Sequence, residues 1–287
     1  MKLGEEVRKI RLFLSNLPSL LYIFLLFYIP IVILLAISFT PPRKFIVEWV
    51  FTVENYINVF TNPNYYRILL NTFWIVVVAT VMLIIIGFPI AYYLARMNRK
   101  LGAKILYFLI IPVEINYLIR VYAWKVILGE NGFLNLLLIS LGIIEKPLTI
   151  FFYSWIAVVI VLIHEWLPYV IVPFYVNLVG ISDEIYDAAM DLGASRLQIF
   201  RTITLPLVKP AILTIVFLVT IPSLGEFAIP YLVGGQSGIM LGVLIDRYLG
   251  GFQLAIGATL SFFLLIITLL LSMVMIKIFG YEALYSR

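Results

Sequence analysis

Residues 181–210 read ISDEIYDAAMDLGASRLQIFRTITLPLVKP, a largely polar segment between two long apolar stretches. Ser182 is a typical helix N-cap, and two acidic residues follow it in the first turn, where the helix dipole favours negative charge. Gly193 predicts a C-terminal stop, and Ser195 with Gln198 predicts a capping box that opens a second helix. We therefore expect two short helices that meet at a glycine corner.

The flanking stretches are two of six that are long and apolar enough to cross a bilayer as helices, which takes about 20 residues each. The expected spans are residues 17–39, 69–95, 105–128, 150–176, 210–233 and 254–279. Of the 287 residues, 63% are apolar and 12% charged, against about 45–50% and about 25% in soluble domains. This composition excludes a soluble enzyme and a nucleic-acid-binding protein. It predicts an all-α membrane protein with a single transmembrane domain over residues 1–287.

Lysine and arginine residues are distributed unevenly among the segments between the spans. With both termini taken as cytoplasmic, the inner segments (residues 1–16, 96–104, 177–209 and 277–287) together hold 13 lysine and arginine residues, whereas the outer segments (residues 40–68, 129–149 and 234–253) hold five. Because basic residues accumulate on the cytoplasmic side of membrane proteins, both termini and the 177–209 segment are predicted to be cytoplasmic. This distribution accounts for the net charge of +5 without an anionic partner such as nucleic acid.

The chain has few residues suited to catalysis or metal binding. It contains no cysteine, which excludes thiol chemistry, and a single histidine, His164. No lysine is followed by Ser or Thr, so the sequence lacks a Walker A phosphate-binding loop. We therefore predict no catalytic residue, no metal site and no cofactor bound by this chain, and we expect any ATP hydrolysis to take place on another polypeptide.

Three carboxylates lie within different expected spans, at Glu114, Glu165 and Glu226. A charged side chain in the membrane is expensive and normally faces a water-filled pathway or an oppositely charged partner. Three carboxylates along one pathway would offset the desolvation of a cationic substrate in steps. For each of them, a structural ion pair or a buried neutral acid is the alternative.

Aromatic residues accompany these charges. Those one helical turn from a charged residue are Tyr117, Trp124 and Tyr169. Their rings can add cation–π contacts to a cationic substrate, so they join the three carboxylates as candidates for the substrate path.

Arg120 would repel a cation, so it is expected to be an ion-pair partner or part of a gate. Pro222 and Gly225 lie beside Glu226 in the fifth span, where proline and glycine weaken the helix. They predict a gate, with a simple packing kink as the alternative. His164 is expected to be a satisfied buried histidine, with a proton relay as the alternative.

The 177–209 segment resembles the EAA loop of ABC importer permeases, whose pattern is E-A-A, three residues, G, nine residues, I-x-L-P. The matching residues here are Asp187, Ala188, Ala189, Gly193, Ile203, Leu205 and Pro206. Asp187 stands where the family usually has glutamate, and its shorter side chain would shift or weaken an ion pair to a partner. The resemblance implies the type I ABC importer permease (MetI-like) fold, with this EAA-like loop (residues 177–209) docking on an ATPase subunit.

Four further stretches are similar to B-type permeases of spermidine/putrescine importers. They are IRVYAW at 119–124, LGENGFLN at 128–135, GEF at 225–227 and LVGG at 232–235. This resemblance implies polyamine transport by alternating access across a bacterial inner membrane. It also implies an ATPase dimer that holds ATP and Mg, a second and different permease chain, an extracytoplasmic polyamine-binding protein and contact with lipid.

Other functions stay open at this point. Permeases for iron, thiamine, phosphonate or sulfate share the fold and the EAA loop. An ATP-independent secondary transporter would also place carboxylates in the membrane. A third class, an intramembrane serine protease, rests on the G-x-S-G pattern around Ser237, with His164 as the base.

Overall fold

The computed structural model describes residues 15–277, which contain helices, turns and irregular segments but no strand. The chain divides into two compact units, Met1–Asn62 with Ile245–Phe263, and Pro63–Leu244 with Leu264–Arg287. Residues 1–14 and 278–287 lie outside the described residues. They include the end of the sixth expected span and some of the basic residues from which the cytoplasmic position of the termini is predicted.

Among the described residues, five helices are long and apolar enough to cross a membrane, and a sixth crossing is possible if a bent helix pair counts as one span. The five are Ser15–Ser38, Pro63–Arg96, Trp155–Val179, Arg196–Leu224 and Leu254–Met275, and the bent pair is Arg99–Glu114 with Tyr117–Ser140. The all-α membrane class expected from the sequence is confirmed, and each expected span has a counterpart.

The third expected span, residues 105–128, is not one straight helix. Its elements are α5 (Arg99–Ile110), the 3-10 turn η2 (Ile111–Glu114) and α6 (Tyr117–Leu128). The chain bends by 90° between the segments before and after Ile115. Pro112 has no N–H to donate, and the Asn116 side chain accepts a hydrogen bond from Leu118 N at 3.0 Å, which caps α6. These two residues explain the break.

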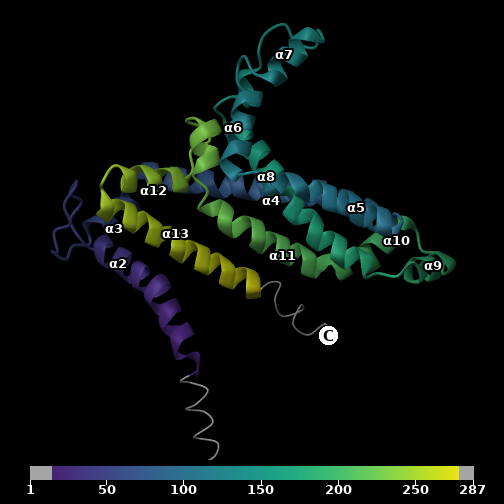
Figure 1. Cartoon of the computed structure of the whole chain (residues 1–287), viewed down its shortest axis with the longest axis horizontal. Coiled ribbons are helices and arrows are strands. Elements are labelled where there is room, and N and C mark those ends of the chain that lie inside the picture. The colour runs from purple at the N-terminus through teal and green to yellow at the C-terminus, as the bar shows by residue number, and fades with distance from the viewer. Residues whose placement is uncertain (1–14, 278–287) are drawn as a thin grey trace, which may run out of the picture. The chain divides into compact units, whose positions relative to one another are not determined.

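Three helices that lie alongside one another form the core of the second unit (Figure 1). They are α4 (Pro63–Arg96), α8 (Trp155–Val179) and α11 (Leu205–Leu224). Their facing sides bury apolar side chains such as Leu83, Phe174 and Ile215. A Cβ atom added to Gly87 of α4 would lie 2.7 Å from Cγ1 of Val170 on α8, so this glycine permits the close approach of the two helices.

The fifth expected span, residues 210–233, is interrupted near its end. Helix α11 ends at Leu224, and the N–H of Gly225 donates to the carbonyl of Pro222 at 3.1 Å. A short turn then leads to the π-helix η5 (Pro230–Gly234). The break places Glu226 just outside a helix end instead of inside a continuous span.

The EAA-like loop forms α9 (Asp183–Asp191), α10 (Arg196–Ile199) and the π-turn η4 (Phe200–Thr204). The predicted capping box is present: Ser195 N donates to Gln198 Oε1 at 2.7 Å, and Gln198 N donates to Ser195 Oγ at 3.3 Å. Gly193 has φ of +81°, a conformation suited to glycine, and ends α9. Ser182 precedes α9 as expected, although its side chain makes no capping hydrogen bond.

One expectation for this loop is wrong. The second helix is not a separate short helix, because α10, η4 and α11 run on as one helix from Arg196 to Leu224. Pro206 lies in the first turn of α11, directly after the wider π-turn. A π-turn changes the hydrogen-bond register by one residue, and this accommodates the missing N–H of Pro206 without a break in the helix.

Helix α7 (Phe133–Ser140) follows α6, and the two project away from α4 and α8 (Figure 1). Asn135, buried at 2% exposure, organises this region. Its Nδ2 donates to the carbonyls of Gly129 and Glu130, both at 3.1 Å, and its Oδ1 accepts from Leu148 N at 2.9 Å. Asn135, the last residue of the LGENGFLN stretch, therefore links the end of α6 to Leu148 through hydrogen bonds.

In the first unit, α2 (Ile29–Ser38) and α3 (Glu54–Thr61) are joined by buried polar contacts. The Asn55 side chain donates to the carbonyls of Ser38 at 3.1 Å and Thr40 at 2.7 Å. Thr259, near the start of α13 (Leu254–Met275), also donates a hydrogen bond from its Oγ1 to the Ser38 carbonyl, at 3.1 Å. The end of α2 is thereby held by two elements distant in sequence.

Candidate functional site

A buried ion pair joins α6 to α8 in the second unit. Arg120 Nη2 lies 2.8 Å from Glu165 Oε2, and the two side chains are only 11% and 4% exposed. Glu165 lies near the middle of α8, the helix that the core residues surround. A lone charge at such a position would be strongly destabilising, so each of these side chains compensates the charge of the other.

The pair is not fully satisfied. Arg120 Nε and Glu165 Oε1 are both buried and have no hydrogen-bond partner among the described residues. His164 Nδ1 lies 3.5 Å from that oxygen, beyond a good hydrogen bond. Since most buried polar atoms in proteins are hydrogen-bonded, the pair retains the capacity to bind a further donor.

Two aromatic residues share the Arg120 face of α6. Tyr117 and Trp124 lie three residues before and four residues after Arg120, a spacing that places all three on one side of a helix. The Trp124 ring meets the His164 ring edge-on, with 5.2 Å between centroids. The hydroxyl of Tyr117 is buried and lies close enough to Glu226, and then to Glu165 and Arg120, to interact with them electrostatically.

Glu226 reaches this region from the turn after α11. Its Oε1 accepts hydrogen bonds from the backbone N–H groups of Ala228 at 2.9 Å and Ile229 at 3.3 Å, which fixes the turn. A Cβ atom on Gly242 would lie 2.4 Å from the Glu226 carbonyl oxygen, so the turn is also closely covered from the other side. We use the name Arg120–Glu165 cluster for Tyr117, Arg120, Trp124, His164, Glu165 and Glu226.

Two expected path residues lie outside this cluster. Glu114 is exposed at the 90° bend, and no ion pair to it occurs among residues 15–277. Tyr169 is 41% exposed, with its ring 5.5 Å from that of Trp166. Of the gate candidates, Pro222 and Gly225 form the end of α11 beside Glu226.

Ser237, the serine of the G-x-S-G pattern, has a structural role, because it accepts hydrogen bonds from two helices. Its Oγ accepts a hydrogen bond from Trp155 N at 3.3 Å, at the start of α8, and its carbonyl accepts from Asn71 at 2.9 Å. His164 lies more than two turns further along α8, beside Glu165. Ser237 therefore fastens a glycine-rich loop to two helices.

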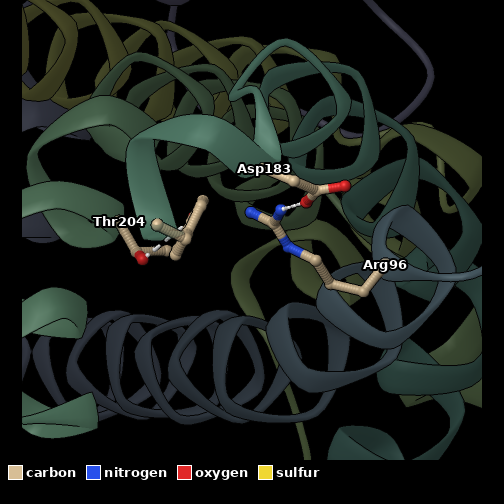
Figure 2. A network of polar contacts seen from close by, with 4 residues as sticks. Arg96, Asp183 and Thr204 are labelled. Atoms are coloured by element: carbon tan, nitrogen blue, oxygen red, sulfur yellow. Dashed lines mark hydrogen bonds and ion pairs between the residues drawn. The ribbon is translucent and has the colours of Figure 1, made fainter. Parts of the chain in front are cut away.

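A second polar network lies at the EAA-like loop. Figure 2 shows Arg96, the last residue of α4, ion-paired with Asp183, the first residue of α9. The Arg96 guanidinium carbon also lies 3.8 Å above the ring of Tyr186. The Tyr186 hydroxyl is 3.1 Å from Thr204 Oγ1 in η4. These four residues, the Arg96 network, connect α4, α9 and the start of the fifth span.

The residues of the EAA pattern face different surroundings. Asp187 lines a cavity of about 470 Å³ together with Arg96, Tyr186 and Arg196. Others are exposed, partly exposed or packed against the core: Ala188, Ala189, Gly193, Ile203, Leu205 and Pro206. Leu192, beside Gly193, is 89% exposed. The loop thus exposes acidic side chains together with Leu192, while Tyr186 on its other side contacts Arg96 at the end of α4.

Sequence reasoning did not find the Arg96 network or the Asn135 contacts. Arg96 and Asp183 are 87 positions apart in sequence. Arg96 was used only as one of the basic residues of the 96–104 segment, which predicts the cytoplasmic side. Asn135 fell within a stretch recognised by resemblance, but nothing in the stretch itself indicated that its side chain is buried. Both depend on tertiary contacts that no local pattern encodes.

A helical chain with several apolar helices long enough to span a membrane, an ion-paired cluster between two of its helices and an exposed polar loop is organised as a membrane permease. The chain belongs to the family described as binding-protein-dependent transport system inner membrane component, which matches residues 85–281. It is thus a subunit of an inner-membrane transport system that works with a binding protein.

Individual relatives are similar over most of the chain. The spermidine/putrescine transport system permease protein PotB of Escherichia coli K12 is 34% identical over 225 residues, 78% of this chain and 81% of PotB. PotB of Haemophilus influenzae is 34% identical over 230 residues, 79% of this chain and 80% of that protein. A crystal structure of a bacterial ABC transporter that imports the acidic polysaccharide alginate matches with a TM-score of 0.73, at 17% identity and with full coverage of both chains. This structural match establishes the shared fold.

Proposed function

We propose that this chain is the permease subunit that forms the translocation path for polyamines, spermidine or putrescine, in an ATP-driven importer. The observation that carries the proposal is the 34% identity to PotB over 78% of the chain. The carboxylates of the Arg120–Glu165 cluster support it, since a multiply charged cation needs anionic groups to replace its water.

The path that we propose uses the residues singled out from the sequence. Glu165 and Glu226 receive substrate ammonium groups beside the rings of Tyr117 and Trp124. Glu114 and Tyr169 serve as successive outlying contacts. The Arg120 ion pair and the Pro222–Gly225 helix end form the gate. Several weak sites in sequence favour transport, because a substrate must leave as readily as it enters.

Coupling to ATP is proposed to occur through the EAA-like loop. Its exposed surface, where Leu192 is 89% exposed beside acidic side chains of α9, docks on one subunit of an ATPase dimer at the cytoplasmic side, and both termini lie on that side. Asp187 and the Arg96 network pass the movement to α4. ATP and Mg stay on the ATPase, and this chain contributes no catalytic residue, metal or cofactor.

The remaining partners of the proposed complex are a second, homologous permease chain, an extracytoplasmic polyamine-binding protein and membrane lipid. The six crossings of this chain would act as one permease domain and pair with those of the second chain. The substrate path would then lie between the two permeases and open alternately to either side.

The test is labelled spermidine uptake in a polyamine-uptake-deficient bacterium that expresses the chain with its ATPase, second permease and binding protein. Gly193 offers a matched pair of variants, because it has φ of +81° and nothing within 4 Å of an added Cβ. Gly193→Val strains the backbone, whereas Gly193→Asn tolerates the left-handed conformation. We expect uptake that requires ATP, disappears in the valine variant and persists in the asparagine variant.

Subunit abundance in the membrane is measured in parallel, so that lost uptake is assigned to coupling only where the complex is assembled. No spermidine or putrescine uptake by an assembled wild-type complex would reject the polyamine substrate. Iron, thiamine, phosphonate and sulfate would then be tested in the same cells. Full uptake without the ATPase would reject the coupling proposal.

A further inference from the structure

The Arg120–Glu165 ion pair poses a problem for a pathway that carries cations, and the inference drawn from it rests on the proposed polyamine function. The carboxylate best placed to receive a substrate, Glu165, is already occupied by a cation of the chain itself. Glu165 is 4% exposed and contacts Arg120 Nη2 through one oxygen, at 2.8 Å. Its second oxygen is buried and has no hydrogen-bond partner in the described part of the chain.

We propose that Arg120 is an internal stand-in for the substrate: it neutralises Glu165 while the path is empty, and an ammonium group of the substrate takes its place on Glu165 during transport. The exchange keeps the buried carboxylate paired at every stage. It therefore avoids the large penalty of an uncompensated charge in the membrane.

The geometry of the pair suits exchange. An arginine and a carboxylate can form two parallel hydrogen bonds, but this pair uses one, with Arg120 Nε buried and unpaired. The pair is thus weaker than the most favourable arrangement. The unpaired Glu165 Oε1 gives the incoming ammonium a first contact before Arg120 departs.

The surroundings also provide a place for the displaced guanidinium. Tyr117 and Trp124 lie on the same face of α6 as Arg120, and aromatic faces bind guanidinium groups. Helix α6 is short and begins directly after a 90° bend, whereas α8 runs unbroken through the core. Arg120 is therefore on the element that can shift, and Glu165 on the one that stays.

Charge balance favours the exchange. With Arg120 on Glu165, Glu226 is the carboxylate of the cluster that forms no ion pair within residues 15–277. Once Arg120 leaves Glu165, the two carboxylates match two ammonium groups of a polyamine. When the substrate moves on, Arg120 returns and displaces it, which prevents Glu165 from becoming a trap.

The test is equilibrium binding of labelled spermidine to the permease–ATPase complex in nanodiscs, with the binding protein left out because it holds substrate itself. Arg120→Gln removes the competing cation, so spermidine should bind at least about tenfold more tightly. Lys125→Gln removes a positive charge from the same helix outside the pair and should change the dissociation constant less than about twofold.

A double-mutant cycle separates exchange from simple repulsion. If Arg120 acts through Glu165, the gain from Arg120→Gln vanishes when Glu165 is already Gln. A gain that persists in the Glu165→Gln background, or an unchanged dissociation constant in Arg120→Gln, overturns the proposal. Where Arg120→Gln assembles poorly, Glu165→Gln is compared with the double variant, and exchange requires equal affinities.

Transport gives an independent readout. Exchange predicts that Arg120→Gln binds spermidine tightly but takes it up slowly, because nothing expels the substrate from Glu165. Failure of this pattern in a complex whose wild type does import spermidine rejects the exchange and leaves the polyamine function standing. Absence of import by the wild type rejects the function itself.

Discussion

Two arginine–carboxylate pairs of the second unit lie in contrasting surroundings. Arg120 and Glu165 are 11% and 4% exposed and lie in the helical core. Arg96 and Asp183 join the end of α4 to the start of α9, and their side chains are 22% and 85% exposed. The same two kinds of side chain are therefore used where water is excluded and where it has access.

The difference lies in what holds each arginine. Water screens the Asp183 carboxylate, and exposed ion pairs contribute about 0–1 kcal/mol. Arg96 is instead held by the ring of Tyr186, 3.8 Å from its guanidinium carbon, while its Nε and Nη2 atoms are buried without a hydrogen-bond partner among the described residues. Among the described residues, no aromatic ring lies over the Arg120 guanidinium in this way, and this buried group depends on the Glu165 carboxylate. The carboxylate is thus essential in one pair and accessory in the other.

The largest effect is expected from Glu165→Leu. This change leaves the Arg120 guanidinium buried without a partner, which is expected to destabilise the chain by about 3–5 kcal/mol. Denaturant-induced unfolding of the purified subunit in detergent measures the loss, and immunoblotting of membranes shows the accompanying fall in abundance.

The matched variant replaces both partners, as Arg120→Met with Glu165→Leu. Because no unpaired charge remains, stability should return to within about 1–2 kcal/mol of the wild type, while polyamine uptake stays abolished. A double variant as unstable as Glu165→Leu alone would show that the pair is not the source of the effect.

An intermediate effect is expected at Tyr186. Tyr186→Phe keeps the ring beneath Arg96 but removes the hydrogen bond to Thr204, whose side chain is buried, at a loss of about 1 kcal/mol. Tyr186→Leu also removes the cation–π contact, for about a further 0.5–2 kcal/mol. The measurement is thermal unfolding together with uptake per assembled complex. Equal effects of the two variants would mean that the ring does not hold Arg96.

Local patterns predicted much of the fold. The apolar runs located the membrane helices, Ser195 and Gln198 predicted the capping box that the structure contains, and Gly193 predicted the end of α9. These features depend on residues within a few positions of one another, so backbone geometry and side-chain chemistry determine them directly. The break at Asn116 was missed because apolar residues continue through it and mask the cap.

The candidate site was predictable only as a set of residues. Glu165, Glu226 and Arg120 could be singled out because they are charged residues inside apolar spans. A charge in the membrane is energetically costly and is normally paired or functional. Which carboxylate pairs with Arg120 depends on how α6 bends and meets α8, and that is a tertiary property. The same holds for Arg96, whose aromatic and acidic partners lie on an element 87 positions away.

The smallest effect is expected from Asp183→Asn. The carboxylate is 85% exposed, so neutralising it should change stability by less than about 0.5 kcal/mol and uptake by less than about twofold. Glu184→Gln, in the same first turn of α9 but outside the ion pair, the cavity and the EAA pattern, is the matched control for removing one negative charge from α9. Uptake and thermal unfolding are measured at low and at physiological salt, where screening should erase any small difference between the two variants. An effect of Asp183→Asn as large as that of Tyr186→Leu would mean that the carboxylate, and not the ring, holds Arg96, and the contrast between the two arginine pairs would no longer stand.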